Sequence, residues 1–105
     1  MKILFDPSVR KYLKEVSEIL YQKEYFGFEE DAIRYIDALI DSIYETLPNR
    51  VHKPAPPYFN RYGKKLLYAT FKKNDHTHWY VFFHYENDIY LIRYISNNHM
   101  IAQHL

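Results

Sequence analysis

Residues 78–95 read HWYVFFHYENDIYLIRYI, and along this run apolar and polar side chains alternate with the period of two that is typical of β-strands. The END at 86–88 is rich in turn-forming residues, so we predict a hairpin with strands at 78–85 and 89–95. One face of the first strand carries Trp79, Val81, Phe83 and Tyr85, and the other carries His78, Tyr80, Phe82 and His84. We expect the first, apolar face to meet a hydrophobic core.

A third strand precedes this hairpin in the sequence. KKLLYATFKK at 64–73 also alternates, and NDHT at 74–77 separates it from the hairpin as a turn. KILF at 2–5 is a short apolar run and is the candidate for a fourth strand. We therefore expect an antiparallel sheet of three or four strands.

Two amphipathic helices are predicted between Asp6 and Pro48. Asp6 and Pro7 form a helix start, because Asp caps the first turn and Pro fits its first position. Apolar residues then recur at i, i+3, i+4 and i+7 before Gly27, and again after Glu29. The stripes are Val9, Tyr12, Leu13, Val16, Ile19 and Leu20 in the first helix, and Ile33, Ile36, Leu39, Ile40, Ile43 and Leu47 in the second. Two such helices joined by a few residues form an antiparallel hairpin.

The fold class that follows is α+β. We predict a short N-terminal strand and the two-helix hairpin, packed on one face of the three- or four-stranded sheet. PNRVHKPAPPYFNRYG at 48–63 is expected as an ordered loop, and SNNHMIAQHL at 96–105 as a short C-terminal helix or tail. The 105 residues suffice for one small core, to which the 19% of aromatic residues add large side chains. Residues 1–105 are therefore predicted as a single domain.

Charge and composition narrow the function classes. Fourteen Lys and Arg against thirteen Asp and Glu leave a net charge of +1, so nucleic-acid binding has to rest on a local patch. The chain has no cysteine, which excludes disulfides and thiolate nucleophiles and fits a reducing cytoplasm. It has no apolar run long enough for a signal peptide or a membrane span, so we predict a cytoplasmic protein without a membrane partner.

The six histidines do not predict a metal site. His76 falls in a turn, and only His78 and His84 share a strand face, where six residues separate them by about 20 Å. The chain has only two glycines and no GxSxG, so it lacks a phosphate-binding loop and a hydrolase nucleophile elbow. We predict no metal and no cofactor.

The order of strand, two helices, Pro-containing loop, three-strand meander and polar C-terminal segment resembles the RelE/ParE superfamily of type II toxin–antitoxin systems. Within it, residues 62–105, and above all IRYISNNHMIAQHL at 92–105, look like the plasmid-stabilisation branch. This resemblance implies a small cytoplasmic toxin that a cognate antitoxin holds inactive. It also implies one of two targets, since RelE-like members cleave mRNA on the ribosome as endoribonucleases and ParE-like members inhibit DNA gyrase by binding it. An inactive binding domain on the same fold is the third alternative, so whether the chain is an enzyme stays open.

Metal-free RNA cleavage needs a base for the 2′-hydroxyl, cations for the phosphate and an acid for the departing 5′-oxygen. RelE-like nucleases place such groups on the sheet and near the C-terminus. His99 is the candidate acid or base, because imidazole titrates near neutral pH, and Arg93 is the candidate phosphate clamp. In the regions of this chain that match those of RelE-like nucleases, the resemblance implies five residues that bind RNA or phosphate. They are Arg61, Lys64, Lys65, Lys72 and Tyr94.

Each of these candidates has a structural alternative. Arg93 is also suited to pack its stem on the sheet and pair its head with an acidic side chain. Lys72 flanks a turn, where lysines are commonly only solvated. His99 and the preceding Asn97 and Asn98 are equally suited to shape a turn or cap the final helix.

An antitoxin interface is predicted for Pro54 to Tyr62 and for the outer sides of the two helices. The anchors that we expect are Tyr58, Phe59 and Tyr62, because aromatic side chains dominate the energetics of such contacts. The alternative for these rings, shared by Tyr68 and Tyr80, is to stack bases or to fill the core.

Overall fold

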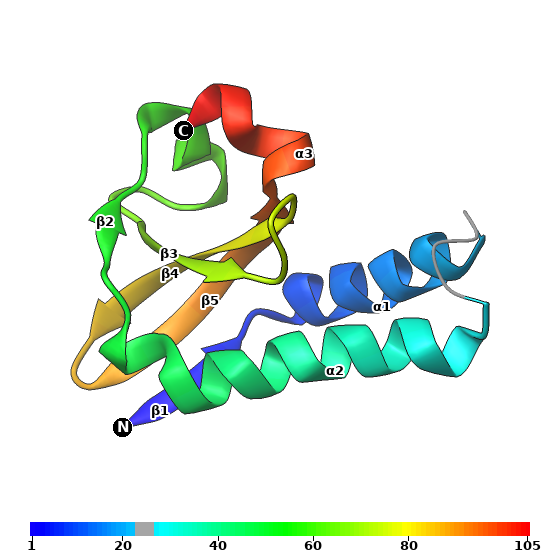
Figure 1. Cartoon of the computed structure of the whole chain (residues 1–105). Helices are drawn as coiled ribbons and strands as arrows, with labels where there is room; N and C mark the ends of the chain where they lie inside the picture. The colour runs from blue at the N-terminus through cyan, green and yellow to red at the C-terminus, as the bar shows by residue number, and fades with distance from the viewer. Residues whose placement is uncertain (23–26) are drawn as a thin grey trace. The chain divides into compact units, whose positions relative to one another are not determined.

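The computed structural model describes residues 1–22 and 27–105, and it has the predicted α+β class. Figure 1 shows the order of its elements. These are β1 (Lys2–Phe5), α1 (Pro7–Gln22), α2 (Glu29–Thr46), the 3-10 helix η1 (Leu47–Asn49), β2 (Lys53–Pro54), the 3-10 helix η2 (Pro57–Tyr62), β3 (Leu67–Lys72), β4 (His78–Glu86), β5 (Ile89–Asn97), α3 (Asn98–Ile101) and the 3-10 helix η3 (Ala102–His104). The N-terminal strand, the two-helix hairpin, the meander and the short C-terminal helix are confirmed.

The described residues form two compact units, which are Met1–Asp6 with Asn49–Leu105, and Pro7–Pro48. The first unit holds the whole sheet and the second holds the helical hairpin. That residues 1–105 form one domain, with the hairpin on one face of the sheet, stays a prediction.

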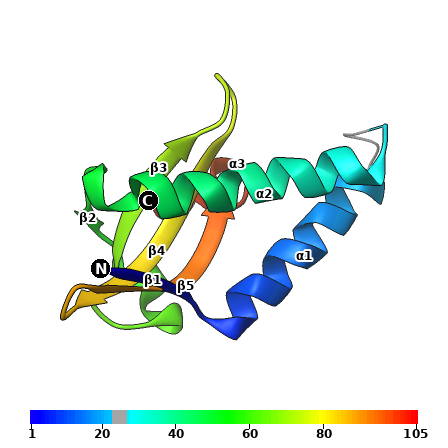
Figure 2. The same cartoon turned by 90° about the horizontal axis from the view of Figure 1, so that it is seen from below.

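The sheet has five strands in the order β1-β5-β4-β3-β2, one more than the largest number predicted (Figure 2). The additional strand is β2, in which Lys53 pairs with Tyr68 and Pro54 with Leu67. It was missed because the prolines around it argue against a strand, although an edge strand tolerates proline. β1 pairs with β5 in parallel, while the other pairings are antiparallel.

A β-bulge lies in the centre of β5. Phe82 of β4 pairs with Tyr94, but its neighbour Phe83 pairs with Ile92, so Arg93 is the extra residue of β5. A simple alternation would place Ile92 and Ile95 on opposite faces. The bulge instead puts both on the face of Phe83, and both are fully buried.

Both faces of β4 carry buried side chains. Trp79, Val81 and Phe83 of the predicted core face are at most 2% exposed. Phe82 on the opposite face is also fully buried, in a second set of side chains that we call the aromatic cluster. Its members are the buried Phe59, Leu66, Phe82 and Ile101, with Ala55, Tyr58, Tyr62, Tyr68, Tyr80 and Tyr94 packed against them. The cluster draws on η2 and α3, so the Pro-containing segment and the C-terminal segment cover part of this face.

The helices α1 and α2 run antiparallel and converge towards their connection (Figure 2). Pro7 opens α1, and three acidic residues occupy the first turn of α2, where the helix dipole favours negative charge. The buried stripe is narrower than predicted, because Ile19 and Ile33 are 47% and 44% exposed. The fully or nearly buried positions are Val9, Leu13 and Ser17 in α1, and Ala32, Ile36, Leu39 and Ile43 in α2.

Phe82→Ala tests whether the aromatic cluster is a genuine second core. Phe82 has no exposed surface and stacks on Phe59 with 4.3 Å between ring centroids. We expect a loss of about 3–5 kcal/mol in the free energy of unfolding, as for other buried phenylalanines. Phe28→Ala is the matched control, since Phe28 is 69% exposed, and its expected effect is below about 1 kcal/mol. Urea denaturation measures both, and equal losses would contradict the assignment.

Candidate functional site

Arg93 occupies the bulge and forms an ion pair. Its Nε lies 3.7 Å from Oδ2 of Asp6, the residue that follows β1, and both side chains are about one-third exposed. This is the arrangement of the structural alternative, in which an acidic side chain holds the guanidinium. Any phosphate at Arg93 has to compete with this carboxylate.

His99 lies at the far end of β5 and is exposed on α3. Its Nε2 is 3.2 Å from Oγ1 of Thr77, in the turn between β3 and β4. The neighbouring Asn98 fastens the same turn, because its side chain accepts a hydrogen bond from the His78 amide and donates one to the His76 carbonyl. From Arg93 to the end of the strand at Asn97 is about 13 Å, so the structure does not bring the two predicted catalytic residues together.

The other predicted RNA-binding residues are spread over the sheet unit. Lys72 is exposed and lies 3.4 Å from Asp75, near the end where His99 lies. Arg61 covers the ring of Tyr58 at 4.0 Å. Tyr94 stacks on Tyr62 with 3.7 Å between ring centroids. Burial, and then a hydrogen bond with Tyr94, raise the pKa of Tyr62 to about 12. Lys64 and Lys65 lie at the opposite end, just before β3.

The three predicted antitoxin anchors differ in exposure. Phe59 is fully buried in the aromatic cluster, so its ring has no free surface for a partner. Tyr58 and Tyr62 are half-buried. Tyr58 stacks in parallel on His104 at 3.5 Å and carries the Arg61 guanidinium as a second stacking partner. Only Tyr58 and Tyr62 of this set offer part of their rings to solvent.

A hollow of about 560 Å³ lies at the end of the sheet where Lys64 and Lys65 are found. We call it the His84 hollow, and its lining residues are Lys65, Leu67, His84, Tyr85, Glu86, Asn87, Ile89 and Leu91. His84, Leu91 and Glu86 share a sheet face with Phe82, as their pairing shows. Ile89 and Leu91 on this face form an apolar floor. The rim carries the Lys65 ammonium group, the His84 imidazole and the Glu86 carboxylate. In the part of the chain that the structure describes, neither Lys65 nor Glu86 forms a salt bridge.

His84 is held in this hollow by two local constraints. Its Nε2 lies 2.9 Å from the carbonyl oxygen of Lys64. Gly63 has a φ of +151°, and a Cβ atom there would lie 3.0 Å from Cε1 of the imidazole. Glycine is needed at this position both for the backbone conformation and for the close approach of the ring.

The sequence prediction did not assign a role to His84 beyond excluding it as a metal ligand. Its place on the mixed face of the strand was predicted correctly. The sequence signal that points to the constrained position of His84 is Gly63. It is one of only two glycines in the sequence and directly precedes Lys64 and Lys65. What the sequence does not give is that the segment before β3 folds back onto His84.

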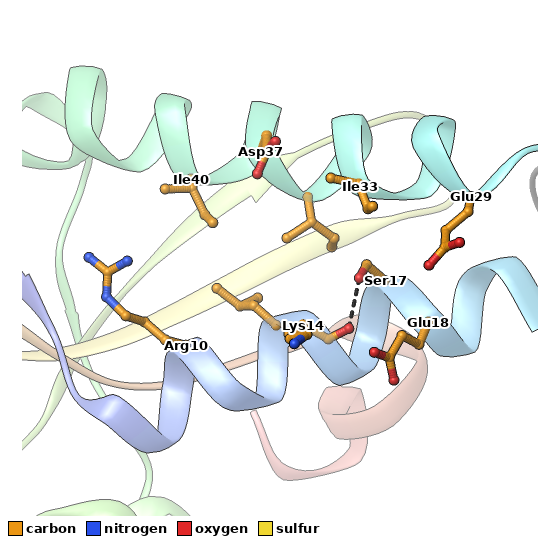
Figure 3. Close-up of a pocket in the computed structure, with 10 residues that line it drawn as sticks. Arg10, Lys14, Ser17, Glu18, Glu29, Ile33, Asp37 and Ile40 are labelled. Atoms are coloured by element: carbon orange, nitrogen blue, oxygen red, sulfur yellow. Dashed lines mark hydrogen bonds between the residues drawn. The ribbon is translucent and has the colours of Figure 1, made fainter.

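A second hollow, of about 290 Å³, lies between the two helices of the hairpin (Figure 3). We call it the hairpin groove. Its floor is formed by Leu13, Ser17, Ile33, Ile36 and Ile40, and its rim by Arg10, Lys14, Glu18, Glu29 and Asp37. Arg10 lies towards one end, Lys14 near the middle, and Glu18 and Glu29 towards the other end (Figure 3). The Ser17 hydroxyl donates to the Lys14 carbonyl, so the floor of the groove presents mainly apolar surface.

Two further findings concern metals and membranes. Among residues 1–22 and 27–105, no three His, Asp or Glu side chains are grouped closely enough to hold a metal ion. In the same part of the chain, no helix has the length and apolar character needed to cross a bilayer.

In comparisons with known proteins, no family model, no curated protein and no solved structure matches this chain. The α+β fold and the geometry of its hollows are therefore the basis for any function.

Gly63→Ala tests the positioning of His84. The added methyl group meets the imidazole, and the left-handed backbone strains the alanine. We expect a loss of about 1–3 kcal/mol in unfolding free energy and a changed NMR chemical shift of the His84 ring. Gly27→Ala is the matched control, because nothing lies within 4 Å of the Cβ position there. An unchanged His84 signal in the Gly63 variant would contradict the described contact.

Proposed function

We propose that this chain is the cytoplasmic toxin of a type II toxin–antitoxin module of the RelE/ParE kind, and that it cleaves mRNA on the ribosome. The observation that carries the proposal is the order of elements, with a β1 strand, a helical hairpin, a Pro-containing segment, a β3-β4-β5 meander and a short terminal helix. This is the order that the resemblance implies. Fold alone does not assign function, so the proposal depends on the experiment below.

RNA cleavage is supported by the chemistry available on the sheet unit. Imidazole and ammonium groups are present there, and together they can accept a proton and stabilise a phosphate without a metal ion. The net charge of +1 gives little long-range attraction to RNA. A ribosome-dependent nuclease does not need that attraction to come from its total charge, because docking on the ribosome brings the mRNA to the site.

DNA gyrase inhibition is the second candidate, and one observation favours it. Arg93 is engaged with Asp6 and His99 with Thr77, so the two residues predicted for catalysis have structural partners. A protein inhibitor of gyrase needs an interaction surface and no catalytic group. An inactive binding domain is the remaining outcome.

Expression of the chain alone in a bacterial culture, with pulse-labelling of protein and DNA, decides between these functions. We expect growth to stop and incorporation of labelled amino acids to fall before that of labelled thymidine, because mRNA cleavage stops translation first. Thymidine incorporation falling first would favour gyrase inhibition. Normal labelling of both, with the folded protein present, would contradict a toxin.

We propose the hairpin groove as the surface that an antitoxin helix covers. Its apolar floor between two charged ends fits an amphipathic helix, whose apolar side chains recur every three or four residues. Tyr58 and Tyr62 are the proposed aromatic contacts outside the groove.

Ile33→Lys tests this docking surface, because Ile33 lines the groove and is 44% exposed. Co-expression with the product of the adjacent gene, followed by titration calorimetry, is expected to show an affinity at least about 10-fold lower, as for a central interface residue. Ile19→Lys is the control, since Ile19 is 47% exposed and does not line the groove. Equal affinities of the two variants would remove the groove from the interface.

A further inference from the structure

The His84 imidazole has a defined hydrogen-bonding arrangement. A backbone carbonyl oxygen only accepts hydrogen bonds, so Nε2, at 2.9 Å from the Lys64 oxygen, carries the hydrogen. In the neutral ring the lone pair then lies on Nδ1. This is how a general base is oriented in many enzymes, with one ring nitrogen anchored and the other available to the substrate.

The surroundings of His84 suit a nucleotide. Lys65 lines the same hollow and supplies an ammonium group, while Ile89 and Leu91, which lie on the same sheet face as His84, supply an apolar floor on which a ribose or a base can lie. Glu86 is the acidic residue of the lining, and it disfavours phosphate on its own side of the hollow. Charge therefore restricts a phosphate to the side of Lys65.

The backbone around the hollow is held in an uncommon conformation. Lys65 has a φ of +56° and Asn87 a φ of +52°, and both line the hollow. For lysine this left-handed conformation costs about 1 kcal/mol or more, which the surrounding structure has to maintain. Gly63 makes room for the His84 ring, and the backbone conformation of Lys65 belongs to the same segment, which the Lys64 carbonyl joins to that ring.

We propose that the His84 hollow binds single-stranded RNA and that Nδ1 of His84 is the general base of its cleavage. The inference rests on the proposed ribonuclease function and moves the acid–base role from His99 to His84. The 2′-hydroxyl gives its proton to Nδ1 as the 2′-oxygen bonds to phosphorus. The bond from phosphorus to the 5′-oxygen breaks, and that oxygen takes a proton from water. Lys65 stabilises the charge on the phosphate, and the products are a 2′,3′-cyclic phosphate and a 5′-hydroxyl.

The test compares His84→Gln with the wild type on purified bacterial ribosomes that carry a defined mRNA. Glutamine keeps an amide donor for the Lys64 carbonyl but has no base. We expect cleavage at least about 100-fold slower, the usual contribution of a positioned general base.

One control variant and two further test variants make the comparison specific. His78→Gln changes another histidine of the same strand and face, outside the hollow, and His99→Gln tests the residue first predicted. His78→Gln is expected to stay within about three-fold of the wild type, as for a residue outside the reacting groups, whereas His99→Gln decides between the two histidines as the base. Lys65→Asn removes the charge with a residue that tolerates positive φ, and we expect a loss of about 10-fold or more. Urea denaturation checks that each variant folds. If His84→Gln does not fold, the cleavage rate of Lys65→Asn tests the hollow instead.

The outcomes separate the inference from the function on which it rests. Wild-type cleavage that persists in a folded His84→Gln variant, or is lost in His99→Gln instead, would overturn the His84 assignment and leave the ribonuclease function standing. Ribosomes left intact by the wild type would overturn the ribonuclease function, and the assignment would fall with it.

Discussion

The single extra residue in β5 determines how the sheet unit is built. Without the bulge at Arg93, a strand that pairs correctly at Tyr90 would turn Ile95 away from the core. With it, Ile92 and Ile95 are buried on one face, and Tyr94 turns to the other, where it stacks on Tyr62. The bulge therefore lets one strand serve two hydrophobic layers. It also gives Arg93 a backbone position of its own, from which it reaches Asp6 after the parallel edge strand.

The aromatic content of the chain follows from those two layers. The elements of the sheet unit that pack on this face are short 3-10 helices and a four-residue helix, and such short elements contribute little apolar area from aliphatic side chains. Large rings compensate, because each buries more area than an aliphatic residue and stacks in a defined geometry. Tyr62 on Tyr94, Tyr58 on His104 and Phe59 on Phe82 are three such pairs, and each joins η2 to a different segment. The rings around Phe59 thus have a structural explanation that requires no ligand.

The periodicity of the sequence predicted the helices and the meander, whose side-chain patterns repeat over many residues. It did not predict features of the structure that depend on a single contact. The helices and the meander follow from spacings that extend over ten or more residues, so local exceptions such as the exposed Ile33 did not obscure them. β2 is two residues long and contains Pro54, and no periodic pattern exists at that length. The burial of Phe82 was missed because alternation gives the face of a side chain but not what covers it.

The residues of the candidate site likewise divide into those that the sequence predicted and those that depend on tertiary contacts. Lys65 was predicted from the regions that the resemblance matched, and it does line a hollow. His84 was assigned correctly to a face, but its contact with the Lys64 carbonyl joins residues 20 positions apart and depends on the missing side chain of Gly63. A histidine on a strand becomes a candidate base only when one ring nitrogen is held and the ring lines a space of substrate size. Those two conditions belong to the tertiary structure, which is why the residue that best meets them is not the one that sequence order favoured.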